Sequence, residues 1–207
     1  IEQSIMYLWQ FAVLLDDNEI ICVYGRYWNE LEELFTRIED EHLITLIFVH
    51  NLSYEFQFLR SHIEIKPEEV FSLKPRKILR IRAGNHMQGN IEFRCSYMQT
   101  HKSLDKFLSD SGVQNQKLKD FDYDKRRYPW TELISKEIEY GCNDVIGLLQ
   151  AMHKRLLDNN DTLYTLPLTS TGYVRREARQ AMKQYNYKKL HSMMCDTSLY
   201  TLLREEF

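Results

Sequence analysis

The chain has 207 residues and a formal net charge of −3, and 43% of its residues are hydrophobic. Such a length can enclose the core of one domain, with or without an appendage, and the 7 glycines and 4 prolines are too few for collagen-like repeats or low-complexity linkers. The longest apolar run, residues 46–49, is far shorter than the roughly 20 residues of a membrane helix, so we expect a cytoplasmic protein with no membrane partner.

The first part of the chain mixes strand and helix patterns. Residues 4–13 and 19–25 predict two strands that form a hairpin around the turn at residues 15–18. Apolar residues at i, i+3, i+4 and i+7 predict a helix over residues 31–38, with Asn29 as its N-cap. The apolar run 43–49 predicts a strand buried on both faces, and residues 53–62 predict a short helix after it.

The second part is dominated by helices. Residues 77–97 predict a hairpin, residues 103–110 a short helix or turn, and residues 114–130 a polar segment without a clear period. The longest helix is expected over residues 133–157, and a basic helix over residues 171–184. The long helix carries an aliphatic stripe formed by Ile134, Ile138, Cys142, Val145, Leu149, Met152 and Leu156.

These elements predict an α/β class domain over residues 1–160 and a helical segment over residues 161–207. The four cysteines, Cys22, Cys95, Cys142 and Cys195, have no paired spacing of the kind that binds zinc. We therefore expect reduced thiols, as is usual for a cytosolic protein.

The segment from His50 to Phe56 is the first candidate for function. It lies where a buried strand ends and a helix begins, and open α/β sheets bind ligands at the carboxyl ends of their strands. A structural explanation is also open. Asn51 or Ser53 can cap the helix, and Glu55 can be a first-turn carboxylate that the helix dipole favours.

The second candidate is the pair Tyr140 and Asp144 on the long helix. The two residues are four apart, so they share a helix face, and that face points away from the aliphatic stripe. Spacing alone is equally compatible with a solvated aspartate next to a half-exposed tyrosine.

Taken together, these segments resemble the 3′–5′ proofreading exonuclease domain of family-B DNA polymerases, and most closely that of bacteriophage polymerases, including the protein-primed group. The DEDD-type family has an Asn-x-x-(Phe/Tyr)-acid segment, a Ser/Thr-Leu-x-x-hydrophobic segment and a Tyr-x-x-x-Asp segment, in that order. The matching residues here are Asn51 with Tyr54 and Glu55, then Ser103 with Leu104 and Phe107, and finally Tyr140 with Asp144. The resemblance covers essentially the whole chain.

The resemblance implies roles for these residues. Glu55 and Asp144 would be acids of a site for two Mg²⁺ or Mn²⁺ ions, and Tyr140 would orient the attacking water. A lysine, either Lys117 or Lys119, would steady the charge of the phosphate. The residues that would hold the last nucleotides of a single-stranded DNA 3′ end are Asn51, Tyr54, Ser103, Leu104 and Phe107.

The resemblance also implies a ribonuclease-H-like fold, a mixed sheet flanked by helices. The family's Asp-x-Glu motif on its first strand has no match here, so we expect that strand upstream of Ile1 and expect the isolated chain to be nearly inactive. Residues 203–207 look like the run that leads towards the polymerase palm domain. The partners implied are the polymerase domain of the parent chain and, in a protein-primed system within a bacterial host, a terminal protein.

Three alternatives remain open. The basic residues Arg175, Arg176, Arg179 and Lys183 can form a stripe that tracks DNA phosphates or simply a solvated helix face. The whole domain can be a catalytically dead scaffold that only binds single-stranded DNA. A stand-alone DEDD nuclease without a role in replication is the third alternative.

Overall fold

The structure, a computed structural model, describes residues 5–15, 18–39, 42–83, 90–118, 121–122 and 124–184. The chain divides into two compact units, Ile1–Leu168 and Thr169–Phe207. The domain boundary expected at residue 160 stays a prediction. None of the described helices is both long and apolar enough to cross a lipid bilayer.

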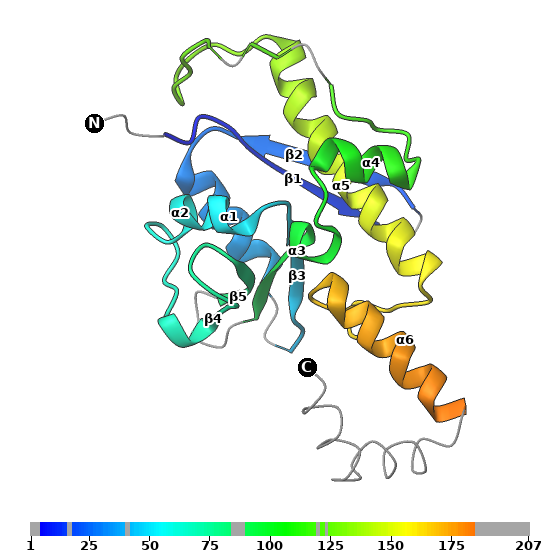
Figure 1. The fold of residues 1–207 in the computed structure, drawn as a ribbon. Coiled ribbons are helices and arrows are strands. Elements are labelled where there is room, and N and C mark those ends of the chain that lie inside the picture. The colour runs from blue at the N-terminus through cyan, green and yellow to red at the C-terminus, as the bar shows by residue number, and fades with distance from the viewer. Residues whose placement is uncertain are drawn as a thin grey trace, which may run out of the picture. The chain divides into compact units, whose positions relative to one another are not determined.

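The first unit starts with the expected hairpin. Strands β1 (Trp9–Leu14) and β2 (Ile20–Gly25) pair antiparallel, with Trp9 opposite Gly25, and form a two-stranded sheet (Figure 1). Helix α1 (Trp28–Ile38) follows. The prediction that Asn29 caps it is wrong, because Asn29 lies inside the helix. Glu30 caps it instead, since its Oε2 accepts the N–H of Tyr27 at 3.0 Å.

A second, mixed sheet has the strand order β3-β6-β5-β4. Strands β3 (Thr45–Val49) and β6 (Ile91–Cys95) are parallel, and Val49 lies opposite Cys95. Strands β5 (Ile78–Ala83) and β4 (Val70–Ser72), the latter preceded by a single 3₁₀ turn (Pro67–Glu69), add to β6 in antiparallel order. The hairpin expected over residues 77–97 is thus confirmed as β5 and β6, although Tyr97 belongs to the next helix.

Helices follow the strand ends. Helix α2 (Leu52–Leu59) comes directly after β3, and helices α3 (Ser96–Thr100) and α4 (Leu104–Ser111) come after β6. The longest helix, α5 (Ser135–Asp158), packs against β1, β2 and α4 (Figure 1). The α/β class with a mixed sheet and flanking helices, expected from the sequence, is confirmed.

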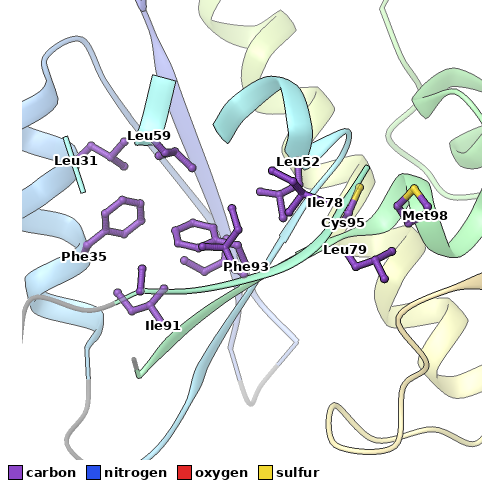
Figure 2. Packing of buried hydrophobic residues seen from close by; sticks show 13 residues of the cluster. Leu31, Phe35, Leu52, Leu59, Ile78, Leu79, Ile91, Phe93, Cys95 and Met98 are labelled. Carbon is purple, nitrogen blue, oxygen red and sulfur yellow. The ribbon is translucent and has the colours of Figure 1, made fainter. Parts of the chain in front are cut away.

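The hydrophobic core lies between the mixed sheet and helices α1 and α2. Phe35 of α1 meets Phe93 of β6 edge to face, with ring centroids 5.7 Å apart, and Leu52 of α2 is fully buried near Ile78 (Figure 2). The other buried members of the cluster are Leu31, Ile47, Leu59, Leu79, Ile81, Ala83, Ile91, Cys95 and Met98. This core fixes the carboxyl ends of β3 and β6 relative to each other.

The predicted aliphatic stripe of α5 describes its burial poorly. Met152 is buried, but Ile134 is 59% exposed, and the buried positions also include Gly147, Leu148 and Ala151. The physical reason is that α5 has neighbours on two sides, the β1–β2 hairpin and α4, so burial is not confined to one stripe. The face of Tyr140 and Asp144 is consequently covered in part.

The cysteines behave as expected where the structure describes them. Cys22, Cys95 and Cys142 are free thiols, and Cys195 lies outside the described residues. Burial, together with a hydrogen bond with Cys142, raises the pKa of the Cys22 thiol to about 12. At neutral pH the Cys22 thiol is therefore protonated and a poor nucleophile.

The second unit contains helix α6 (Ser170–Gln184), as the sequence predicts. Arg175 and Arg179 are exposed on it, whereas the guanidinium of Arg176 lies 5.1 Å from the ring centroid of Tyr173. Both exposed arginines are available for an anionic ligand, and the phosphate-tracking stripe stays a prediction.

Candidate functional site

The carboxyl ends of β3 and β6 meet because these two strands are parallel. His50 follows β3, and its Nδ1 lies 3.0 Å from the hydroxyl of Ser96, the first residue after β6. The Ser96 hydroxyl also lies 3.3 Å from the carbonyl oxygen of Val49. Asn51 and His101, which follow these ends, have φ angles of 66° and 54°, a region that L-residues adopt mainly at turns and functional sites.

His50 begins the first candidate segment of the sequence, which gave it no role of its own. Burial lowers the pKa of His50 to about 4, a hydrogen bond with the Lys102 backbone opposes that shift, and the positive charge of Lys117 adds to it. The imidazole is therefore neutral at physiological pH. The available signal was its place directly after a buried strand, which is a weak one.

Asp144 on α5 is a partly buried acid. Its Oδ2 lies 3.8 Å from Nζ of Lys117, a loose ion pair, and its Oδ1 is buried and accepts no hydrogen bond from any residue that the structure describes. Burial raises the pKa of Asp144, and the charge of Lys117 opposes that shift. The alternative of a fully solvated aspartate is thus wrong, because the side chain is 22% exposed.

Lys117 therefore connects residues of the two candidate segments, Asp144 and His50. It pairs with Asp144 on α5, and its charge acts on His50 at the end of β3. Lys119, the other lysine that the resemblance offered, lies outside the described residues. The region combines a carboxylate, an ammonium and a neutral imidazole from three segments distant in sequence.

Tyr140 lies one helical turn before Asp144 and stacks on an aromatic neighbour. Its ring centroid is 4.4 Å from that of Phe121, and the guanidinium of Arg127 lies 4.3 Å from the Phe121 ring on a cation–π contact. This packing fixes the Tyr140 ring on the same side of α5 as Asp144, as their four-residue spacing predicts.

The segment after β3 presents several of the predicted residues to solvent. Asn51 occupies the N-cap position of α2 without a side-chain cap, and the Ser53 hydroxyl instead accepts the N–H of Ile78 at 2.9 Å. Tyr54 is 57% exposed and packs edge to face on Phe58. The capping explanation for Asn51 and Ser53 is therefore wrong, which leaves Asn51 and Tyr54 free to contact a ligand.

Glu55 lies on α2, and its side chain is exposed to solvent. Protein atoms around its carboxyl group nevertheless reduce its hydration and raise its pKa. A side chain can combine these properties when it is accessible from one side and lined by protein on the other. Within the described residues, no contact joins Glu55 to Asp144, so their use as a pair of metal ligands stays a prediction of the resemblance.

The Ser103, Leu104 and Phe107 motif caps helix α4 and packs it against the core. The Ser103 hydroxyl accepts the N–H of Lys106 at 3.3 Å and caps α4, and Leu104 is half-buried. Phe107 is 4% exposed, so the expectation that it touches nucleotides has to be corrected. Phe107 and its neighbour Leu108 are the buried residues of α4, and large apolar side chains are usually buried in this way.

The residues present fit a divalent cation in part. Within the described part of the chain the buried Oδ1 of Asp144 has no hydrogen-bond partner, and an oxygen ligand of this kind suits Mg²⁺ or Mn²⁺. Across the described ranges, however, no group of three or more His, Cys, Asp or Glu side chains is arranged to hold a metal ion. Two metal ions remain a prediction of the resemblance.

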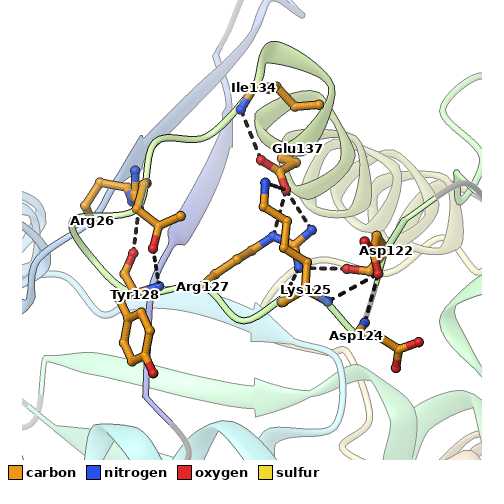
Figure 3. A network of polar contacts seen from close by, with 9 residues as sticks. Arg26, Asp122, Asp124, Lys125, Arg127, Tyr128, Ile134 and Glu137 are labelled. Atoms are coloured by element: carbon orange, nitrogen blue, oxygen red, sulfur yellow. Dashed lines mark hydrogen bonds and ion pairs between the residues drawn. The ribbon is translucent and has the colours of Figure 1, made fainter.

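A buried ionic network fastens the polar segment before α5 (Figure 3). Glu137 accepts hydrogen bonds from Nε of Arg127 at 2.8 Å, Nζ of Lys125 at 2.9 Å and the N–H of Ile134 at 3.0 Å. Arg26 donates to the carbonyls of Tyr128 and Thr131 in the same segment. Since Arg127 lies over Phe121, which stacks on Tyr140, the network also supports the Tyr140 ring.

This network makes stability depend on pH. The hydrogen bond from Lys125, with those from Ile134 and Arg127, lowers the pKa of Glu137 from 4.5 to about 2 despite its burial. Because the folded-state pKa is the lower one, the stabilisation is complete above pH 4.5 and is lost as the pH falls towards 2. We expect Glu137→Gln to have a lower free energy of unfolding than the wild type at neutral pH, with the difference shrinking below pH 4.5.

Urea unfolding of both proteins at a series of pH values measures this difference. Glu139→Gln, an exposed change on the same helix, is the matched control and should behave as the wild type at every pH. A wild-type-minus-variant difference that stays constant down to pH 2 would contradict the lowered pKa of Glu137.

The fold is similar to that of solved viral polymerases. Phi29 DNA polymerase complexed with single-stranded DNA aligns with a TM-score of 0.67 and 13% identity, over 88% of this chain and 33% of the polymerase chain. The same polymerase complexed with primer-template DNA in a post-translocation binary complex aligns with a TM-score of 0.68 and 14% identity, over the same shares. Its orthorhombic crystal form gives 0.58 and 15%, over 81% of this chain and 30% of that chain.

This chain spans about a third of the length of the polymerases it matches. No family model and no curated protein matches the sequence. At such low identity the likeness establishes the fold alone. The resemblance to a protein-primed family-B polymerase, expected from the motifs, is confirmed at that level.

Proposed function

We propose that this chain is the 3′–5′ exonuclease part of a family-B DNA polymerase, with a ribonuclease-H-like fold, and that it hydrolyses the terminal phosphodiester of single-stranded DNA. The observation that carries the proposal is Asp144, whose buried Oδ1 has no hydrogen-bond partner among the described residues while Lys117 stands beside Oδ2. An unsatisfied buried oxygen costs about 1–3 kcal/mol, so it calls for a ligand. The similarity to a polymerase in complex with single-stranded DNA supports this substrate.

Two divalent ions, when bound, would supply activation of the attacking water and stabilisation of charge on the leaving 3′ oxygen. Asp144 and Glu55 are the described residues that would hold them, because Mg²⁺ and Mn²⁺ take carboxylate oxygens. The raised pKa of both carboxyl groups fits this role, since a poorly hydrated carboxylate gains most from a nearby cation. Further acids would have to come from outside the described residues.

The remaining residues would bind and orient the substrate. The Lys117 ammonium would stabilise negative charge on the phosphate, and the hydroxyl of Tyr140, whose ring rests on Phe121, would orient the attacking water. Asn51 and the exposed ring of Tyr54 would hold the terminal nucleotides, and stacking on a tyrosine tolerates any base. This tolerance suits a proofreader, which has to remove every kind of terminal nucleotide.

The test is a degradation assay on labelled single-stranded DNA with the longer polypeptide to which the proposal assigns this segment. With Mg²⁺ we expect stepwise shortening of 5′-labelled DNA from its 3′ end, and no shortening after chelation of the metal. The isolated 207-residue chain should be much slower, because it would contribute too few acids. Degradation from the 5′ end, or degradation without metal, would contradict the proposal.

A single-stranded-DNA-binding scaffold without catalysis is the second candidate. The observation that favours it is that the described residues hold no cluster of three or more metal-ligating side chains. The same assay separates the two, since a scaffold in the longer polypeptide would bind the DNA and leave its length unchanged.

A further inference from the structure

A network of three side-chain amides ties the polar segment before Lys117 to α5. Nδ2 of Asn115 donates to Oδ1 of Asn143 at 2.7 Å, and Oδ1 of Asn115 accepts from Nε2 of Gln150 at 3.0 Å. The backbone N–H of Asn115 donates to Oε1 of Gln150 at 3.2 Å. Asn115 thus forms three hydrogen bonds to two residues that are two turns apart on one face of α5.

The network continues to the residue next to Lys117. Nδ2 of Asn143 donates to the carbonyl oxygen of Gln116, and Nε2 of Gln116 donates to carbonyl oxygens of Val113 and Leu108. In all these hydrogen bonds the amide nitrogens donate and the amide oxygens accept. If the side-chain amide of Asn115, Asn143 or Gln150 were rotated by half a turn, donor would face donor or acceptor would face acceptor. The hydrogen bonds therefore fix the register of residues 115–117 on α5.

Close backbone approach supports the same register. A Cβ atom on Gly147, which lies between Asn143 and Gln150 on that face, would come within 2.6 Å of the carbonyl oxygen of Asn115. A side chain there would force the segment outwards, because a backbone oxygen cannot swing aside as the end of a side chain can. The glycine therefore lets residues 113–117 lie directly against the helix.

We propose that Asn115, held by Asn143 and Gln150, is the positioning residue that sets the Lys117 ammonium beside Asp144. Lys117 lies two positions after Asn115, and Asn143 immediately precedes Asp144, so one amide pair fixes both partners of the 3.8 Å ion pair. The relevance to catalysis rests on the proposed function, whereas the placement of Lys117 can be tested without any nuclease assay.

The test uses the ring titration of His50, followed by NMR on the 207-residue chain. Its resonance among the 7 histidines is assigned by its absence in His50→Gln. The Lys117 charge lowers the pKa of His50, so Lys117→Met should raise that pKa. If Asn115 positions Lys117, Asn115→Ala should raise it as well, by at least half of the shift that Lys117→Met produces.

Gln114→Ala is the matched control, since Gln114 is the exposed neighbour of Asn115, and it should leave the His50 titration unchanged. Gly147→Ala is a second route to the same end. It removes no hydrogen-bonding group and adds a good helix former, yet it should displace the segment and raise the pKa of His50.

A lower melting temperature of Asn115→Ala with an unchanged His50 titration would mean a purely structural role and would overturn the proposal. An unchanged His50 titration in Lys117→Met would overturn it too, because Lys117 would then not stand at the site in solution. Failure to detect nuclease activity in the longer polypeptide would count against the proposed function while leaving the positioning result intact.

Discussion

Asp144→Asn is expected to reduce hydrolysis at the DNA 3′ end by about 100-fold or more, because even outer partners of metal ligands contribute about 10- to 100-fold. Asparagine keeps the shape of the side chain but loses the negative charge that would bind a divalent cation. The measurement is the single-turnover rate of 3′-end shortening by the longer polypeptide, with DNA affinity measured separately. Affinity should stay close to that of the wild type, since Asn51 and Tyr54 are untouched.

The same substitution should not destabilise the fold. Burial raises the pKa of Asp144, which means that burying the charged carboxylate costs free energy on folding, and the charge of Lys117 offsets part of that cost. Removing that charge is expected to leave the melting temperature of the 207-residue chain unchanged or higher. A residue kept at a cost to stability is typical of a functional site.

Asp158→Asn is the matched control, an exposed aspartate at the end of the same helix, and it should change neither rate nor stability. Glu55→Gln should reduce the rate as Asp144→Asn does, in line with its predicted role as the second acid. An undiminished rate in Asp144→Asn would remove this residue from the catalytic site and, with it, the main support for the nuclease.

Glu92→Ala is expected to lower the free energy of unfolding by about 3 kcal/mol, at the lower end of what breaking a buried ion pair costs. Glu92 is 1% exposed and lies among Arg94 at 2.6 Å, Arg82 at 3.0 Å and Arg80 at 3.8 Å. Burial alone would raise the pKa of Glu92, but hydrogen bonds from Arg94 and Arg82 outweigh it and lower that pKa. The Glu92 carboxylate is therefore charged and is the shared partner of three arginines on the sheet.

Of the three arginines, Arg94 is the one whose charge would be left least hydrated by the loss of Glu92. Its side chain is 15% exposed, so it cannot turn into water as Arg82, at 47%, can. Urea unfolding of the 207-residue chain measures the loss, with exposed Glu64→Ala as the control. The double variant Glu92→Leu with Arg94→Leu should recover stability relative to Glu92→Leu alone, because it leaves no unpaired buried charge on Arg94. Equal stabilities of wild type and Glu92→Ala would contradict the account.

The sequence predicted local structure well where one short window contains the whole signal. The hairpin of β1 and β2, the hairpin of β5 and β6 and the long helix α5 all lie where alternation or helical spacing placed them. The N-cap of α1 was missed because Asn29 has the right chemistry, yet Glu30 reaches back to the free N–H of Tyr27. Both choices satisfy local rules, and packing of Leu31 and Phe35 selects between them.

Motif spacing also singled out four candidate site residues, whose roles stay predictions. Tyr140 and Asp144 follow from their four-residue separation, and Asn51 with Tyr54 from their place after a strand. Phe107 was assigned wrongly, since an apolar residue on a short helix looks the same in sequence whether it faces a ligand or the core. It is 4% exposed in the fold.

What the sequence by itself determined, then, is the succession of strands and helices and the residue types at the ends of β3 and on α5. Only the tertiary structure decided that Asp144 is partly buried and that Lys117 stands beside it. It also decided that His50 is neutral and that Asn115 is hydrogen-bonded to α5. The physical reason is range. Backbone preference and apolar period act over a few residues, whereas desolvation, ion pairing and amide pairing join residues that are dozens of positions apart and exist only once the core has packed.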